Sequence, residues 1–138
     1  MSETHATGGC LCGALRYEAR GEPTMTGLCY CADCRKASGS GFIPFMGFKA
    51  SALRFTGPTR QSVTKSARGT EAVRNFCGVC GSLVFGGVVG KDDAHTIYAG
   101  SLDDPSHFRP LIAIFAAGRP DWALIPPGLV VFDRMPGP

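Results

Sequence analysis

Several features that would assign this chain to a broad class of protein are scarce or missing in its sequence. No apolar run approaches the ~18 residues that a membrane-spanning helix needs. The first seven residues include Glu3 and lack an apolar core, so they resemble neither a secretory signal nor a membrane anchor. Charged residues make up only 18% of the chain, the net charge is +3, and the basic residues are scattered. We therefore expect a soluble, cytoplasmic protein with no membrane partner, and the weak charge argues against nucleic acid as a partner.

Long helices are excluded as well. The 138 residues include 19 glycines and 10 prolines, and no clean helical periodicity extends over ten or more residues without one of them. Short strand-like segments recur instead at intervals of roughly 8 to 12 residues, which predicts an all-β domain. Only Ala32–Ser38 leaves room for a short helix, ended by Gly39. Strands are expected over residues 14–19, 25–29, 42–48, 52–56, 60–65, 71–76, 83–89, 96–100 and 111–116.

The length of the chain is typical of one domain. We assign residues 1–7 to a flexible tail and residues 8–138 to a single domain. The apolar segment 42–48 contains three phenylalanines, which could wall a substrate pocket but are more typical of a core. Within it, Pro44 favours an edge or an irregular strand over a central position in a sheet.

Seven cysteines are present, an odd number that would leave one unpaired in a disulfide framework. In a reducing cytoplasm, thiols bind metal or do chemistry more often than they pair. Four of them form a C-x-C pair, Cys10 and Cys12, and a C-x-x-C pair, Cys77 and Cys80. Neighbouring glycines allow both pairs to bend, so we predict one closed, structural zinc site on these four residues. The alternatives are cysteines that merely pack and a redox C-x-x-C, although the βαβ setting of the latter is absent.

The other three cysteines, Cys29, Cys31 and Cys34, lie within six residues and precede a positive charge at Arg35. Three thiolates on one zinc ion leave a fourth coordination position for water or a substrate, and zinc lowers the pKa of the group that binds there. These cysteines are therefore the candidate catalytic residues, on a second zinc ion that could be labile. Arg35 would offset the charge of the thiolates and could hold an acidic substrate, or it is an ordinary solvated residue.

Two alternatives remain for the three-cysteine group. A fourth protein ligand could close the site, or the thiols could hold no metal. The three histidines of the chain are more typical of surface or hydrogen-bonded positions than of ligands. The one candidate aspartate is more typical of a helix cap. The candidate fourth ligands are His5, His95, His107 and Asp33.

Four motifs resemble, in order, those of the glutathione-dependent formaldehyde-activating (GFA) family, also called the centromere-protein-V family. They are residues 9–17 (GCLCGALRY), 29–36 (CYCADCRK), 76–81 (FCGVCG) and 100–105 (GSLDDP). The resemblance implies a zinc-stabilised β-tent fold of several small antiparallel sheets, with a structural zinc on the four-cysteine set and a catalytic zinc on the three-cysteine set. Tyr30 departs from the family pattern, which often has histidine there, at a position that is not a presumed ligand.

The resemblance also implies a carbon–sulfur lyase class of activity, in which glutathione adds to formaldehyde to give S-hydroxymethylglutathione. Our hypothesis is a zinc-dependent enzyme that acts on glutathione, or a similar thiol, and an aldehyde adduct. The alternative is a non-catalytic zinc module that binds a protein or nucleic acid. The sequence leaves the oligomeric state open. Five basic residues in a segment with few acids could hold carboxylates or phosphates, or could form solvated strand faces: Arg54, Arg60, Lys65, Arg68 and Arg74.

Overall fold

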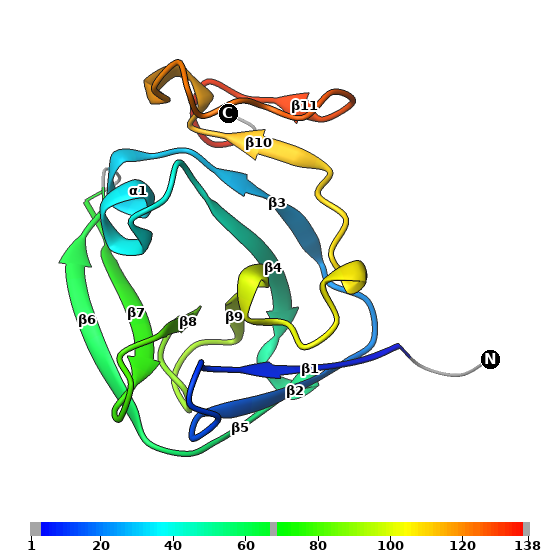
Figure 1. Ribbon diagram of the computed structural model, residues 1–138, viewed down its shortest axis with the longest axis vertical. Helices are drawn as coiled ribbons and strands as arrows, with labels where there is room; N and C mark the ends of the chain where they lie inside the picture. The colour runs from blue at the N-terminus through cyan, green and yellow to red at the C-terminus, as the bar shows by residue number, and fades with distance from the viewer. Residues whose placement is uncertain (1–3, 67–68, 137–138) are drawn as a thin grey trace.

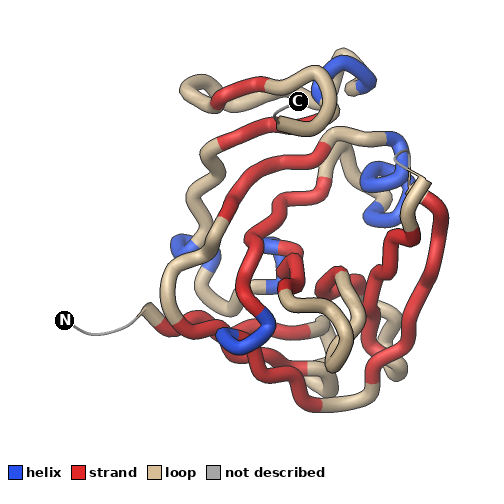
Figure 2. The backbone as a smooth tube through the Cα atoms, turned by 180° about the vertical axis from the view of Figure 1, so that it is seen from behind, coloured by secondary structure: helices blue, strands red, loops and turns tan. Residues whose placement is uncertain are grey.

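The computed structural model describes residues 4–66 and 69–136, which form mainly β-strands, with one α-helix, α1 (Ala32–Ser38). A small sheet has the strand order β1-β2-β5, and a large sheet of eight strands is strongly curved (Figure 1). The view from behind shows the same curve (Figure 2). The mainly β prediction is therefore confirmed. The strands are β1 (His5–Gly9), β2 (Arg16–Arg20), β3 (Met25–Cys29), β4 (Ile43–Lys49), β5 (Leu53–Thr56), β6 (Thr59–Lys65), β7 (Glu71–Cys77), β8 (Leu83–Gly86), β9 (Ala94–Tyr98), β10 (Ile112–Ile114) and β11 (Val130–Val131).

Alternation of apolar and polar residues explains how the small sheet packs. In β2, Tyr17 and Ala19 are buried while Glu18 between them is only partly covered, as expected for a strand with one face on a core. The main core joins this face to strands of the large sheet. Its buried members outside β2 include Leu15, Met46, Phe48, Val84, Phe85 and Ile97.

The short helix follows its local sequence closely. Cys31 is the N-cap of α1, and its sulfur accepts a hydrogen bond from the Cys34 backbone N–H. Gly39 ends the helix in the left-handed conformation, with φ of 68°, which glycine adopts without strain. The predicted bounds of the helix are confirmed.

Residues 1–7 were expected to form a flexible tail, but the structure shows that strand β1 begins at His5. His5–Gly9 pairs with β2 along its whole length, while residues 1–3 lie outside the described part. Ala6 is buried in the main core, and a side chain at Gly8 would collide with the hydroxyl of Tyr17. The strand has no apolar alternation because its residues are small, so sequence periodicity did not indicate it.

Strand β4 lies between β3 and β9, which corrects the edge position expected from Pro44. The proline is tolerated because it stands just before the β4–β9 pairing, which begins at Phe45↔Tyr98, so that ladder does not need its missing N–H. The large sheet is also not wholly antiparallel. Strand β10 pairs in parallel with both β3 and β11, and it brings the C-terminal segment over the end of β3.

Candidate functional site: two cysteine clusters and a cavity

The four-cysteine set comes together as predicted, with all its sulfurs within 4.8 Å of one another. The sulfurs of Cys10 and Cys12 lie 3.6 Å apart, and those of Cys12 and Cys77 lie 3.8 Å apart. Zn–S bonds of about 2.3 Å at tetrahedral angles place sulfurs about 3.8 Å apart. The spacing and the soft donor set therefore fit one zinc ion, which would tie the β1–β2 turn to the end of β7.

Hydrogen bonds from the surrounding chain reach two of these sulfurs, those of Cys77 and Cys80. The Cys77 sulfur accepts backbone N–H groups from Val79 and Cys80, at 3.3 and 3.4 Å. The hydroxyl of Ser82 lies 3.1 Å from the Cys80 sulfur, and hydrogen bonds from this serine lower the pKa of Cys80 to about 5. The contacts with Ser82 favour the thiolate of Cys80, which is the form that binds metal.

The three-cysteine set also comes together, at the point where β3 passes into α1. The sulfurs of Cys29 and Cys34 lie 3.1 Å apart, and all three lie within 4.8 Å of one another. Hydrogen bonds from the thiols of Cys29 and Cys34 lower the pKa of Cys31. The hydrogen bonds of Cys34 with Cys29 and Cys31 raise the pKa of Cys34. Cys31 supplies one of these three sulfurs from the N-cap of the helix, and three soft donors fit a zinc ion.

No other ligand joins this set among residues 4–66 and 69–136. His95 is buried against the stacked rings of Phe55 and Phe85, with a T-shaped contact to each. The other two histidines are at the surface, where His5 Nε2 lies 3.7 Å from Glu18 and His107 Nε2 lies 3.6 Å from Asp104. The arrangement thus supplies three protein sulfurs and leaves any further coordination position to water or a ligand.

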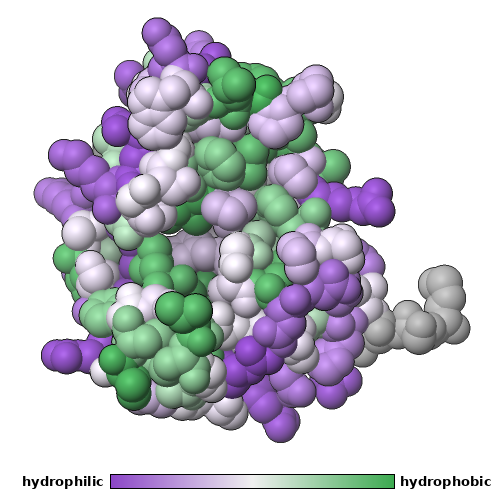
Figure 3. Space-filling model, in the orientation of Figure 1, coloured by the Kyte–Doolittle hydropathy of each residue, from purple (hydrophilic) through white to green (hydrophobic). Residues whose placement is uncertain are grey.

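These three sulfurs face a cavity of about 940 Å³, near the upper end of the ~300–1,000 Å³ typical of small-molecule sites. Figure 3 shows the corresponding face of the molecule hollowed near its centre, with hydrophobic residues along part of the rim. Residues from α1, the ends of β3 and β4, the strands β7 to β9 and the C-terminal segment line it. The cavity is large enough for a small peptide-like thiol.

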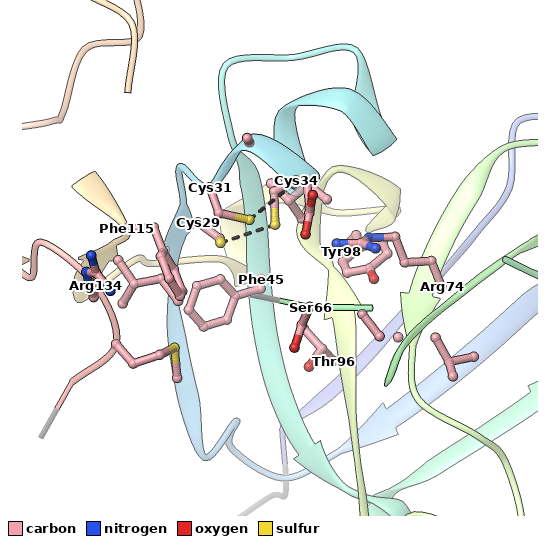
Figure 4. Close-up of a pocket in the computed structure, with 18 of the residues that line it drawn as sticks. Cys29, Cys31, Cys34, Phe45, Ser66, Arg74, Thr96, Tyr98, Phe115 and Arg134 are labelled. Atoms are coloured by element: carbon pink, nitrogen blue, oxygen red, sulfur yellow. Dashed lines mark hydrogen bonds between the residues drawn. The ribbon is translucent and has the colours of Figure 1, made fainter. Parts of the chain in front are cut away.

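Two phenylalanines form an apolar wall beside the sulfurs (Figure 4). Phe45 extends from β4. Phe115 has φ of 54°, in the left-handed region that non-glycine residues rarely adopt, and its N–H donates to the carbonyl of Arg134 at 3.1 Å. Backbone held in such a conformation is concentrated at functional sites. Sequence reasoning considered Phe45 but missed Phe115, since nothing in the sequence marks a positive φ at a phenylalanine.

The cations are placed differently from the sequence expectation. Arg35 does not line the cavity, and its Nε is buried without a hydrogen-bond partner among the described residues. Arg74, one of the five basic residues noted above, does line it and is only 9% exposed. Arg54, Arg60 and Lys65 are exposed strand residues, and Arg68 lies outside the described residues.

Tyr30 takes no part in the site although it stands between two of the cysteines. Its side chain is fully buried, its ring packs against Phe42, and its hydroxyl donates to the carbonyl of Leu124 at 2.7 Å. A buried tyrosine that needs this one acceptor is a packing residue. The departure from the family pattern therefore falls in the contact between β3 and the C-terminal segment, away from the cavity.

Comparisons with known proteins give the family of this chain and a similar fold. The model of the family described as glutathione-dependent formaldehyde-activating enzyme matches residues 5–118, so the chain belongs to this family. The crystal structure of a Rhodobacter sphaeroides protein is similar, with a TM-score of 0.52 and 19% identity over 91% of this chain and 98% of that chain. At that identity the likeness concerns the fold alone. None of the curated proteins matches this chain.

The structure also bears on the membrane expectation. Among the described residues, no helix is long and apolar enough to cross a membrane. The α-helix α1 has only 7 residues.

Proposed function

We propose that this protein is a zinc-dependent carbon–sulfur lyase acting on glutathione, or a similar small thiol, and its aldehyde adduct. The observation that carries the proposal is a set of three convergent sulfurs on the wall of a large cavity, with no fourth protein ligand among the described residues. Membership of the family supports glutathione and formaldehyde as the reactants. The four-cysteine set then has the structural role.

The reaction joins two small molecules reversibly. The thiol sulfur forms a bond to the aldehyde carbon, and the thiol proton ends on the former carbonyl oxygen; the reverse reaction breaks the same bond and restores both reactants. Zinc held by Cys29, Cys31 and Cys34 would lower the pKa of a thiol beside it and so favour the thiolate.

The chain itself contributes position and a sheltered environment. Cys29 is fixed by the ladder of β3, and Cys31 is fixed as the cap of α1, so the sulfurs need little reorganisation to act together. Phe45 and Phe115 cover one side of the sulfur cluster. Such a wall limits the access of water, which strengthens electrostatic interactions in the site.

The proposal is tested with the zinc-loaded protein. Magnetisation-exchange NMR measures interconversion between glutathione with formaldehyde and S-hydroxymethylglutathione. We expect the protein to accelerate it above the rate in buffer with equal zinc, and Cys31→Ser to abolish the acceleration. Lys36→Gln, an exposed change on the same helix outside the cavity, should leave the rate unchanged. No acceleration by the wild-type protein would contradict the proposal.

The same sample distinguishes the non-catalytic alternative. Duplex DNA is titrated into the protein at physiological salt, where weak charge contacts are largely screened. We expect no saturable binding. Saturable binding together with no acceleration of exchange would instead favour a zinc module that recognises nucleic acid.

A further inference from the structure

The cavity contains a buried cation that has no anionic partner among the described residues. Arg74 is 9% exposed, and its Nη1 donates one hydrogen bond, to the Thr64 hydroxyl at 3.1 Å. It forms no ion pair with any described residue. A guanidinium has five N–H donors, and burying its charge is costly without a counter-ion. Most of its hydrogen-bonding capacity is therefore available to a ligand in the cavity.

The acidic residues of the cavity do not serve as that counter-ion. Each of them is exposed, whereas Arg74 is buried, and none forms an ion pair with it. The cavity thus has its carboxylates toward solvent and a cation inside. The carboxylates are those of Asp33, Glu71, Asp92 and Asp133.

Strand register places a hydroxyl beside this cation. Arg74 pairs with Gly86, and Gly86 pairs with Thr96, so the three residues form a row across β7, β8 and β9. Tyr98 lies two residues beyond Thr96 and therefore on the same face of β9. A Cβ at position 86 would lie only 2.9 Å from the Tyr98 hydroxyl. Glycine in this row makes room for that hydroxyl next to Arg74.

Tyr98 also links the cation to the sulfur cluster. Cys34, Tyr98 and Arg74 all line the cavity, and Figure 4 shows the Tyr98 side chain between the other two. Its hydroxyl makes no hydrogen bond with any of the described residues. One small molecule whose sulfur lies at the cysteines can therefore reach both side chains with its other end.

We infer that Arg74 and Tyr98 form a subsite that binds a carboxylate of the thiol substrate. The inference rests on the proposed function, because it takes the reacting sulfur to lie at the three-cysteine set. A planar guanidinium binds a carboxylate with two parallel hydrogen bonds, and the tyrosine hydroxyl can donate a third. The subsite selects thiols that carry a carboxylate and discriminates against neutral thiols of the same size.

The wild-type, zinc-loaded protein gives the first test. Dissociation constants of 3-mercaptopropionate and of its neutral methyl ester are measured by titration calorimetry. We expect the acid to bind about tenfold or more tightly than the ester, as charged hydrogen bonds in a buried site would give. Equal binding of the two thiols would overturn the subsite and leave the proposed function intact. If neither thiol binds, the proposed function fails, and the subsite fails with it.

Variants then locate the preference. Arg74→Gln should reduce the preference for the acid over the ester to about twofold or less, because only the binding of the acid becomes weaker. The matched control is Arg60→Gln, which removes the same charge from an exposed position on β6 outside the cavity and should retain the full preference. Tyr98→Phe should weaken the binding of the acid several-fold and leave the binding of the ester unchanged. An equal loss in the Arg60 and Arg74 variants would show a general effect of net charge and contradict the subsite.

The Arg74 side chain also bonds to Thr64, so thermal unfolding is measured for each variant. If Arg74→Gln does not fold, the comparison of acid and ester on the wild type and on Tyr98→Phe decides the question. A Tyr98→Phe variant that loses affinity for both thiols equally would count against a carboxylate at this position.

Discussion

The two cysteine groups differ in how much of the chain each joins, and this predicts different contributions to stability. In the four-cysteine set, Cys12 and Cys77 are 65 residues apart in sequence, whereas Cys29 and Cys34 in the other set are 5 apart. An unfolded chain must close these loops to gather the sulfurs, and the folded chain has already closed them. By loop-closure entropy, a metal therefore prefers the folded chain by about 4 kcal/mol for the long loop and about 2 kcal/mol for the short one.

The perturbation is a pair of matched double variants. Cys12→Ser with Cys80→Ser removes two exposed sulfurs, so the new hydroxyls carry no burial cost, and we expect the free energy of unfolding to fall by about 4 kcal/mol. Cys31→Ser with Cys34→Ser should lower it by only about 2 kcal/mol, because serine is itself a preferred N-cap for α1. Against a typical total of ~5–15 kcal/mol, the first loss is large.

The assay is urea unfolding of zinc-loaded protein, followed by far-ultraviolet circular dichroism, with zinc counted by elemental analysis. The wild type should contain two zinc ions, and each double variant should lose one. Equal losses of stability, or a larger loss for the Cys31 and Cys34 pair, would refute the loop argument. The three-cysteine set would then be structural, and the reason for placing chemistry there would disappear.

Two further changes test contacts that hold the small sheet. Asp103→Asn should lower the free energy of unfolding at neutral pH by up to about 1 kcal/mol, since the carboxylate forms a surface ion pair with Arg16. Hydrogen bonding to Arg16 lowers the pKa of Asp103 to about 2. The stabilisation is therefore fully present above the pKa of about 4 that Asp has in the unfolded chain, and it is lost as the pH falls toward 2. At that pH the urea unfolding curves of variant and wild type should converge. Gly57→Ala should lower the free energy of unfolding by more than about 2 kcal/mol, because φ is 107° and a Cβ would overlap the carbonyl of Ala14. The control Gly90→Ala, where φ is 86° and the space is open, should lower it by about 1 kcal/mol. Equal costs for the two glycines in urea unfolding would show that the backbone relieves the overlap.

Much of the local structure follows from the sequence because local forces decide it. The alternation of Tyr17 and Ala19 with polar neighbours matches one buried face of β2, and the stop at Gly39 matches its left-handed backbone. Strand β1 was not predictable in this way. Its small residues give no periodic signal, and it forms because β2 offers a free edge and the core accepts Ala6.

The candidate site also has one part that follows from local sequence and one part that depends on the tertiary structure. Cysteine spacing by itself pointed to the C-x-C pair, the C-x-x-C pair and the three-cysteine group, because thiols two or three residues apart on a turn can converge locally. The fold was needed to bring Cys12 to Cys77, which is 65 residues away in sequence. Only the tertiary structure decided which other side chains face the three-cysteine set. Arg35 is adjacent in sequence yet does not line the cavity, whereas Arg74 and Tyr98, from β7 and β9, do line it because strand register aligns them. Neighbours along a strand point to opposite faces, so sequence distance does not tell which cation faces a cavity, and the pairing of strands does.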